Sequence, residues 1–272
     1  KYEDLDPLRW ISNPDGTSVQ PPSNPPTVRS IFVPTTLSAG EFSAGAGCTD
    51  NRRHLKQMFR HSLLAPLVVI LDPAICLHTP EWLWLSTGVR AIDHVVEDLC
   101  SINLQPYVEG TARHALQLLA NGLPKSKENP SDLNARLNCQ TGAWMSMIGG
   151  AAGVKKGASH GIGHMLGGVA NVPHGYTSCV MLPSVLAWNE SVNGSQQAVV
   201  SETLGQPGEA ASKVIGNLIS NLGMPECLRD VGVSKDQFQE IAEASMHDRW
   251  IQSNPRKITT PSQIAEILEM AW

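Results

Sequence analysis

Several features that mark whole classes of protein are missing from this chain of 272 residues. No apolar run reaches the roughly 18 residues that a membrane-spanning helix needs. No block of Lys or Arg reverses the net charge of -5, so a nucleic-acid surface is not expected. The first ten residues are charged and lack the apolar stretch of a signal peptide. The chain also does not begin with Met, and we expect it to start inside a longer gene product.

Cysteine is sparse, and its spacing is uninformative. The 6 cysteines form no Cys-x-x-Cys pair, and disulfide frameworks are typical of short secreted chains. Two glycosylation sequons, at Asn189 and Asn193, are short patterns that arise by chance. We therefore expect reduced thiols and a cytoplasmic location.

The N-terminal region carries only two strand signals. A chain of this length can bury a large core and suggests one or two domains. Residues 30–34 and 67–71 are apolar and β-branched, which predicts two short buried strands. Two strands do not make a stable sheet alone, so residues 1–72 are expected to be the remnant of an α/β unit.

From residue 79 onward the signals are helical, and no internal repeat is visible. Thr79 and Pro80 predict a helix start, with a break at Thr87–Gly88 before residue 99. Further helices are expected from residue 131, over 211–222, after the capping box at 234–237, and from residue 260 to the end. The buried candidates of the helix from residue 131 are Leu133, Leu137, Trp144, Met147 and Ile148. The fold class is therefore mainly α, with a helical domain at 73–272.

The segment GASHGIGHMLGGVANVPHG, residues 157–175, concentrates glycine and histidine. His160 and His164 lie four residues apart and share a helix face, and His174 follows ten residues later. One interpretation is a packing seam, in which the glycines let helices approach and the histidines are bonded core residues. Another is a metal site, because three imidazoles and a carboxylate hold a divalent ion with an open position.

A third interpretation is a serine nucleophile. The residues Gly157-Ala-Ser159-His-Gly161 match Gly-x-Ser-x-Gly, but that turn must follow a strand, and no β-branched run precedes it. A phosphate-binding glycine loop is not expected, because Gly161 and Gly163 are followed by Gly167, one residue too late.

These motifs together resemble the iron-containing alcohol dehydrogenase family, which includes the maleylacetate reductases. The resemblance covers nearly the whole chain from residue 30, and the histidine block is its most specific part. The matching segments are VPTT at 33–36, ILDP at 70–73, TGVRAIDH at 87–94, SHGIGH at 159–164, LGG at 166–168, VPHG at 172–175, NLGMP at 221–225 and SNPR at 253–256.

The resemblance implies that His94, His160 and His174 occupy the family's metal-ligand positions. Arg90 stands where metal-binding members have Asp. A permanent cation beside a divalent ion is unfavourable, so we expect no tightly bound iron or zinc.

The resemblance also implies a site for NAD(P)H. His164 matches the histidine near the nicotinamide that is linked to proton relay, and Thr35 and Thr36 match the turn beside the cofactor. The glycine-rich turn that holds the phosphates is missing from residues 1–72.

Arg90 has two interpretations of its own. Its planar guanidinium suits a carboxylate, so Arg90 and the imidazoles would form a pocket for a small anionic substrate. Maleylacetate reductases act on a dicarboxylate, and many work without a metal. Alternatively, Arg90 pairs with Asp93 or Glu97 as a structural bridge, because these acids lie on nearby faces of the helix.

Three functions follow. The first is an NAD(P)H-dependent reductase of a small carbonyl or carboxylate substrate, acting as a homodimer whose nucleotide-binding half lies outside this chain. The second is a cofactor-free isomerase, lyase or cyclase that uses the same pocket for acid–base chemistry. The third is a non-catalytic interaction protein. The resemblance favours the reductase.

Overall fold

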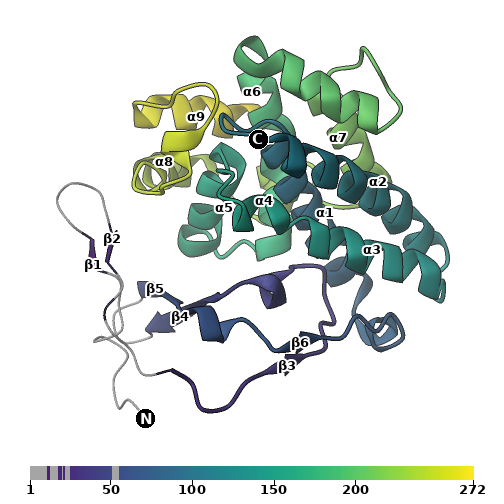
Figure 1. The fold of residues 1–272 in the computed structure, drawn as a ribbon. Helices are drawn as coiled ribbons and strands as arrows, with labels where there is room; N and C mark the ends of the chain where they lie inside the picture. The colour runs from purple at the N-terminus through teal and green to yellow at the C-terminus, as the bar shows by residue number, and fades with distance from the viewer. Residues whose placement is uncertain (1–10, 13–17, 20, 22–24, 51–54) are drawn as a thin grey trace. The chain divides into compact units, whose positions relative to one another are not determined.

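The structure is a computed structural model that describes residues 11–12, 18–19, 21, 25–50 and 55–272 (Figure 1). The chain divides into two compact units, which we describe separately. One unit, called the N-terminal unit, comprises Lys1–Pro34 and Gly40–Ile70, and the other, called the helical unit, comprises Thr35–Ala39 and Leu71–Trp272. We retain 1–72 and 73–272 as the proposed domain division.

In its described part, the N-terminal unit contains three two-stranded sheets and two short 3-10 helices. The elements are β1 (Ile11–Ser12), β2 (Ser18–Val19), β3 (Ile31–Phe32), η2 (Gly40–Phe42), β4 (Gly45–Asp50), β5 (Leu55–Arg60), η3 (Ser62–Leu64) and β6 (Val68–Val69). Strands β1 and β2 are antiparallel, as are β4 and β5, whereas β3 and β6 pair in parallel, with Ile31 opposite Val68.

The predicted strands at 30–34 and 67–71 are present as β3 and β6, but they are not buried as expected. Ile31 is 61% exposed and Val68 is 45% exposed. Parallel strands are normally buried because helices cover both faces of their sheet. In the described residues of the N-terminal unit there is no α-helix to cover either face.

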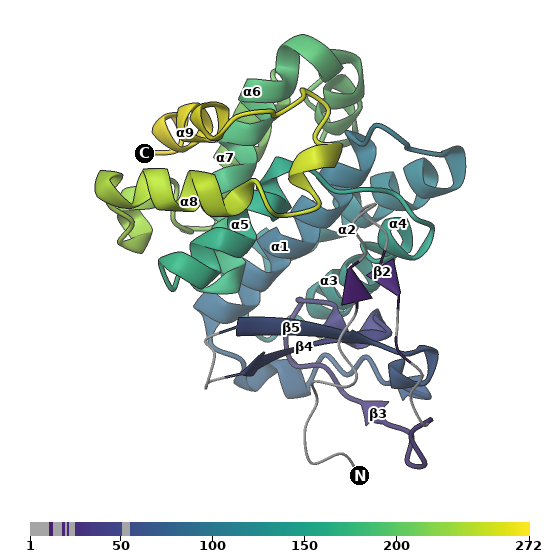
Figure 2. The same cartoon turned by 90° about the vertical axis from the view of Figure 1, so that its left-hand side faces the viewer.

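The helical unit confirms the mainly α prediction. Its helices are η4 (Ile75–His78), α1 (Glu81–Leu99), α2 (Pro106–Glu128), α3 (Leu133–Met145), α4 (Ile148–Ala151), α5 (Ala158–Val169), α6 (His174–Thr203), α7 (Ala211–Asn221), η5 (Leu228–Val231), η6 (Lys235–Gln237), α8 (Phe238–Ser245), η7 (Ile251–Ser253) and α9 (Pro261–Met270). Helix α1 lies at the centre of this unit and packs against α2 and α6, while α5 packs against α6 and α8 (Figure 2). None of the described helices is both long and apolar enough to cross a membrane.

Helix α1 runs without the predicted break. The hydroxyl of Thr87 donates to the Leu83 carbonyl (2.7 Å) and accepts the backbone N–H of Leu37 (3.0 Å). A Cβ at Gly88 would collide with the side chain of Leu123 on α2. The Thr-Gly pair therefore lets two neighbouring segments dock closely on α1. Every residue from 84 to 99 is buried, so any charge on this helix needs a partner.

The prediction for the helix from residue 131 is wrong about its buried face. Leu133, Leu137 and Trp144 are 41%, 39% and 52% exposed. The small residues Ala135 and Cys139 are buried instead, and a Cβ at Gly122 of α2 would meet the Cys139 sulfur. Small side chains at this contact let α2 and α3 pack closely. The sequence interpretation also missed α2 itself, which begins at Pro106.

The predicted C-terminal helices are confirmed. Helix α7 ends before Gly223, whose φ of 67° is the left-handed conformation that favours glycine. The capping box predicted at Ser234 precedes η6, and the helix start predicted at Thr260 is present, where Thr260 forms a capping box with Gln263. None of the six cysteines forms a disulfide.

Candidate active site

The buried helix α1 carries a row of ionisable side chains on one face. Arg90, Asp93, His94 and Glu97 are spaced by three and four residues, which places them side by side. Their exposed fractions are 3%, 0%, 9% and 7%. Burial this deep is unfavourable for unpaired charges. The partners on α5 and α6 therefore determine which of these four α1 side chains can carry a charge.

Asp93 on α1 bonds to side chains on α5 and α6 and so connects the three helices. Its Oδ2 accepts hydrogen bonds from the hydroxyls of Ser178 on α6 (2.6 Å) and Ser159 on α5 (3.0 Å). Arg90 Nη1 lies 3.3 Å from the same oxygen and 3.0 Å from the Ser178 hydroxyl. Burial raises the pKa of Asp93, and the charge of Arg90 opposes that rise. The structural bridge weighed for Arg90 is therefore present, and its acid is Asp93.

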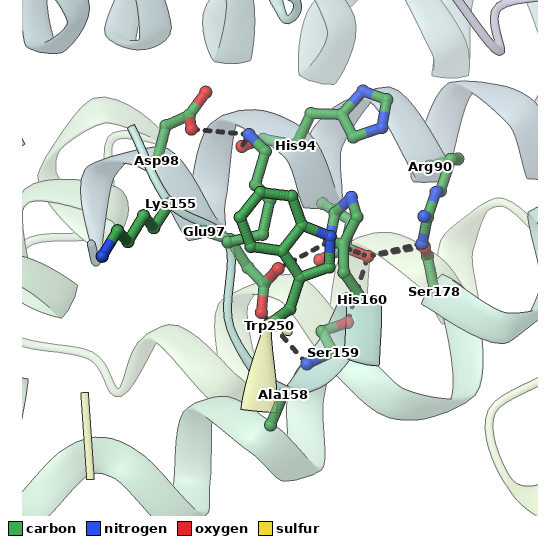
Figure 3. A network of polar contacts seen from close by, with 12 residues as sticks. Arg90, His94, Glu97, Asp98, Lys155, Ala158, Ser159, His160, Ser178 and Trp250 are labelled. Carbon is green, nitrogen blue, oxygen red and sulfur yellow. Dashed lines mark hydrogen bonds and ion pairs between the residues drawn. The ribbon is translucent and has the colours of Figure 1, made fainter. Parts of the chain in front are cut away.

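Glu97 and His160 form a second buried pair (Figure 3). His160 Nδ1 lies 2.5 Å from Glu97 Oε2, and the backbone N–H of Ser159 donates to Glu97 Oε1 (3.0 Å). Burial, and then the negative charge of Asp93, raises the pKa of Glu97 to about 8. Burial also lowers the pKa of His160 well below its usual value. Both shifts favour a neutral pair that shares one proton between Oε2 and Nδ1.

The four predicted histidines come together as one row. The ring centroids are 5.1 Å apart for His94 and His160, 6.5 Å for His160 and His164, and 6.5 Å for His164 and His174. The last two rings are nearly parallel, with 7° between their planes. His94 and His160 are buried, whereas His164 is partly exposed and His174 is exposed. The row, called the histidine row below, therefore leads from the core to the surface.

His164 has a carboxylate partner that the sequence interpretation missed. Its Nδ1 lies 2.8 Å from Oδ2 of Asp248, a residue in the turn after α8. The other carboxylate oxygen of Asp248 accepts the backbone N–H of Trp250 (2.9 Å). His164 thus pairs through Nδ1 with Asp248, whereas His160 Nδ1 faces Glu97 at 2.5 Å and Asp93 Oδ2 at 3.5 Å.

The residues do not fit a divalent metal at the family's ligand positions. Within the described part of the chain, one group of three potential ligands has all its ligand atoms within 4.8 Å, namely Asp93, Glu97 and His160. Asp93 Oδ2, Glu97 Oε2 and His160 Nδ1 already bind one another, Arg90 or neighbouring hydroxyls, whereas Asp93 Oδ1 and His160 Nε2 have no hydrogen-bond partner among the described residues. His94, His160 and His174 do not make such a group, and the buried guanidinium of Arg90 adds a positive charge beside them.

The Pro-Thr-Thr turn is anchored to α1. The Thr79 hydroxyl donates to the Thr35 carbonyl (2.6 Å), and the Thr36 hydroxyl lies 3.1 Å from that of Ser38. The structure brings the four histidines and Arg90 together, but it does not link either threonine to them through a hydrogen bond between described residues. That Thr35 and Thr36 face the same cavity as His164 stays a prediction.

The glycines and the serine of the 157–175 segment have structural roles. Ser159 lies in the first turn of α5, fully buried, and bonds to Asp93, so it is not a nucleophile on a strand-to-helix turn. A Cβ at Gly161 would lie 2.8 Å from the Ile251 side chain, whereas Gly168 has open space. The packing interpretation therefore holds for some of the glycines, while the histidines of the same helix form the row.

The two acids that face the α5 histidines differ in how well the sequence could reveal them, and Glu97 was named there only as a possible partner of Arg90. Glu97 shares a helix face with Arg90 and His94, so the spacing alone would have added it to the candidate site. Asp248 lies 84 residues from His164 along the chain, and no local pattern connects the two. Lys156, which bonds Asp98 (2.5 Å) and the His94 carbonyl (2.7 Å), is likewise brought in only by the fold.

Comparisons with known proteins concern the family and the fold of the chain. The model of the Fe-containing alcohol dehydrogenase family, C-terminal, matches residues 84–272. The chain is 36% identical to Dehydrogenase ALT3 of Alternaria alternata over 91% of its own length and 72% of that protein. It is 32% identical to 1,3-propanediol dehydrogenase of Citrobacter freundii over 89% of its own length and 65% of that protein. The crystal structure of maleylacetate reductase from Agrobacterium tumefaciens superposes with a TM-score of 0.80 at 28% identity, covering 90% of this chain and 67% of that one.

These matches span most of the chain but only about two thirds to three quarters of each relative. They include the histidine row and the α1 face that binds it. The family match, the identities and the shared helical fold lead to one conclusion: this chain belongs to the iron-containing alcohol dehydrogenase family, a family of oxidoreductases.

Proposed function

We propose that the chain forms the catalytic part of an NAD(P)H-dependent oxidoreductase that reduces the carbonyl group of a small anionic substrate. The observation that carries this proposal is the histidine row beside the buried cation Arg90. Reduction of a carbonyl needs a proton donor for the oxygen, and an anionic substrate needs a fixed positive charge. Both are present at one place, and the named relatives are dehydrogenases and a reductase.

His164 is the proposed proton donor. Its side chain is 35% exposed, so a substrate can reach it, whereas His160 behind it is buried and held neutral by that burial. A reduced nicotinamide, when bound, supplies the hydride that adds to the carbonyl carbon. The imidazolium of His164 gives its proton to the carbonyl oxygen, which becomes a hydroxyl.

Arg90 is the proposed anion-binding group. One of its terminal nitrogens, Nη1, is occupied by Asp93 and Ser178. Its Nε has no hydrogen-bond partner among the described residues, although it is buried. A buried N–H without a partner is unfavourable, and a substrate carboxylate in this region would satisfy it.

The nicotinamide is proposed to lie beside Thr35 and Thr36. Their turn is fixed to the N-terminal end of α1 by hydrogen bonds through Thr79 and Thr87, so it keeps its place relative to the helix that carries Arg90. We propose that the cofactor phosphates are held by a nucleotide-binding half outside residues 1–272. We also propose that the protein is a cytoplasmic homodimer that binds neither nucleic acid nor membrane.

The proposal is tested on the intact gene product, which includes the nucleotide-binding half proposed outside residues 1–272. It is titrated with NADH and NADPH, and nicotinamide oxidation is then followed with two probe substrates. The probes are propanal, which is neutral, and 2-oxoglutarate, which carries two carboxylates. We expect saturable binding of one nicotinamide and a higher kcat/KM for 2-oxoglutarate. An Arg90→Leu variant should lose the preference for 2-oxoglutarate while its rate with propanal changes less.

One observation favours a second candidate, a cofactor-free isomerase, lyase or cyclase. The pairs Glu97–His160 and His164–Asp248 both lie within this chain, so its acid–base groups do not depend on a nucleotide-binding half. Failure of the protein to bind either nicotinamide would favour this candidate. A folded protein that turns over neither probe substrate would favour a non-catalytic interaction protein.

A further inference from the structure

The pairing of His164 with Asp248 is a built contact rather than a chance meeting of two surface side chains. The His164 Nδ1 lies 2.8 Å from Asp248 Oδ2, within the range of a strong charge-assisted hydrogen bond. Asp248 is only 12% exposed. Exposed ion pairs contribute little because their side chains are free to move, and this carboxylate is not free.

Three further contacts fix the position of Asp248. Its second oxygen, Oδ1, accepts the backbone N–H of Trp250 (2.9 Å). Its own backbone N–H donates to the Ser245 carbonyl (2.9 Å), and its carbonyl accepts the N–H of Ile251 (3.2 Å). Both oxygens and both backbone groups are therefore in use, so the carboxylate presents one fixed acceptor to His164.

The His164 ring is held from its other sides as well. The His160 ring meets it edge to face, with 87° between the planes, and the His174 ring lies parallel to it. An imidazole in such a setting cannot easily turn to exchange its two nitrogens. The nitrogen that faces the carboxylate must donate, because a carboxylate only accepts.

We propose that Asp248 is a positioning residue for His164: its carboxylate holds a proton on Nδ1 and so assigns proton exchange with the substrate to Nε2. In the neutral ring, Nε2 carries the lone pair and can accept a proton. In the imidazolium, Nε2–H donates to the carbonyl oxygen while hydride from the reduced nicotinamide adds to the carbon. The Nδ1 proton stays on the ring throughout, in its hydrogen bond to Asp248. The part of Nε2 in proton exchange with the substrate rests on the proposed function, whereas the protonation of Nδ1 does not.

The tautomer is measured first, without activity. The protein is labelled with ¹⁵N-histidine, and the His164 signals are identified by their loss in a His164→Ala variant. We expect the neutral His164 ring to be protonated on Nδ1 in the unmodified protein. In Asp248→Asn the amide nitrogen can donate to the ring, so the proton should move to Nε2. A wild-type ring protonated on Nε2, or a tautomer unchanged in Asp248→Asn, would overturn the proposal even if the enzyme is active.

Turnover gives the second measurement, with NAD(P)H and the two probe substrates. We expect Asp248→Asn to lower kcat by roughly 100-fold or more with little change in KM, and to be at least as slow as Asp248→Ala. A merely structural role predicts the reverse order, since Asn is nearly isosteric with Asp. Glu240→Gln, which removes an exposed carboxylate from α8, serves as the matched control and should behave like wild type.

A double variant completes the test. In a His164→Ala background, Asp248→Asn should cause no further loss of kcat, because its effect passes through the imidazole. A further loss as large as in the wild-type background would overturn the proposal. A protein that binds no nicotinamide but shows the expected tautomer change would refute the proposed reductase function and still support the positioning role.

Discussion

Nδ1 of His160 lies 2.5 Å from Oε2 of Glu97, and both side chains are buried where α5 begins against α1. Each group alone would be unfavourable in its charged form at this depth. A single proton between Oε2 and Nδ1 serves both groups. His160 Nε2 has no hydrogen-bond partner among the described residues, so the bond to Glu97, and not solvent, orients the ring. The pair therefore sets the orientation of the ring that stands behind the proposed proton donor.

The pH dependence of stability reports on this pair. Glu97 keeps its proton in the folded protein up to a pKa of about 8, whereas in the unfolded chain it loses the proton near its usual value of 4.5. The unfolded state thus binds fewer protons between these values, and the contribution of Glu97 to stability falls as pH rises. We expect the free energy of unfolding of wild type, relative to Glu97→Gln, to decrease from pH 5 to pH 8, by at most about 1.4 kcal/mol per pH unit. Urea denaturation at several pH values measures it.

The comparison with a variant is needed because other groups titrate over the same range. Burial lowers the pKa of His160, so below its usual value of 6.5 the unfolded state binds the extra proton, and His160 alone makes stability rise with pH. Glu97→Gln keeps the burial that lowers the pKa of His160, so the difference between the two proteins reports Glu97 together with its coupling to His160. A difference that stays constant from pH 5 to pH 8 would show that Glu97 is ionised in the folded state. Glu240→Gln controls for the loss of an exposed acid.

The glycine at the start of α6 should be intolerant of a side chain. A Cβ at Gly175 would lie 2.9 Å from the backbone carbonyl carbon of Ser86 on α1, and backbone cannot move aside as a side chain can. We expect Gly175→Ala to reduce the free energy of unfolding by about 1–3 kcal/mol. Gly194, in the same helix, has open space around it, and Gly194→Ala should be neutral or stabilising by up to about 1 kcal/mol. Equal effects of the two substitutions would contradict the close approach of α6 to α1.

How far the sequence predicts this fold depends on the range of the signal. Most local signals at helix ends were reliable: the capping box at Ser234, the start at Thr260 and Gly223 mark ends that the structure confirms, whereas the Thr87–Gly88 break predicted inside α1 is wrong. Burial was less predictable, because it depends on the neighbour. The α3 leucines were expected inside, but α2 approaches α3 through Cys139 and small residues, which turns the larger side chains outward.

The candidate site shows the same division. His160 and His164 were expected on one helix face from their spacing, and the structure places them on α5 within 6.5 Å of each other. The acids that pair with them, Glu97 on α1 and Asp248 in the turn after α8, depend on how α1, α5 and α8 pack. The histidine motif and Glu97 can therefore be found in the sequence, whereas Asp248, the acid that faces His164, is visible only in the fold.

Proton transfer by His164 predicts a loss of turnover without a loss of stability. The side chain is 35% exposed and makes one ion pair, so its removal leaves no buried cavity. We expect His164→Ala to lower kcat by roughly 100-fold or more, as for loss of a general acid. The denaturation midpoint should stay close to that of wild type. His247→Ala, which removes an exposed imidazole near α8, is the control. Unchanged turnover in a folded His164→Ala protein would assign the residue to packing.

Arg90 is expected to decide whether the histidine row can hold a metal. Two unit charges 4 Å apart repel by about 4 kcal/mol at an effective dielectric of 20, and a divalent ion doubles this. We therefore expect no stoichiometric iron or zinc in protein purified without chelator, measured by elemental analysis. Arg90→Asp supplies a carboxylate where a cation stood, and this variant should gain metal. Arg90→Leu removes the cation but adds no ligand and should stay largely free of metal. Stoichiometric metal in the unmodified protein would show that Arg90 turns away from the row, and that the imidazoles form a metal site despite it.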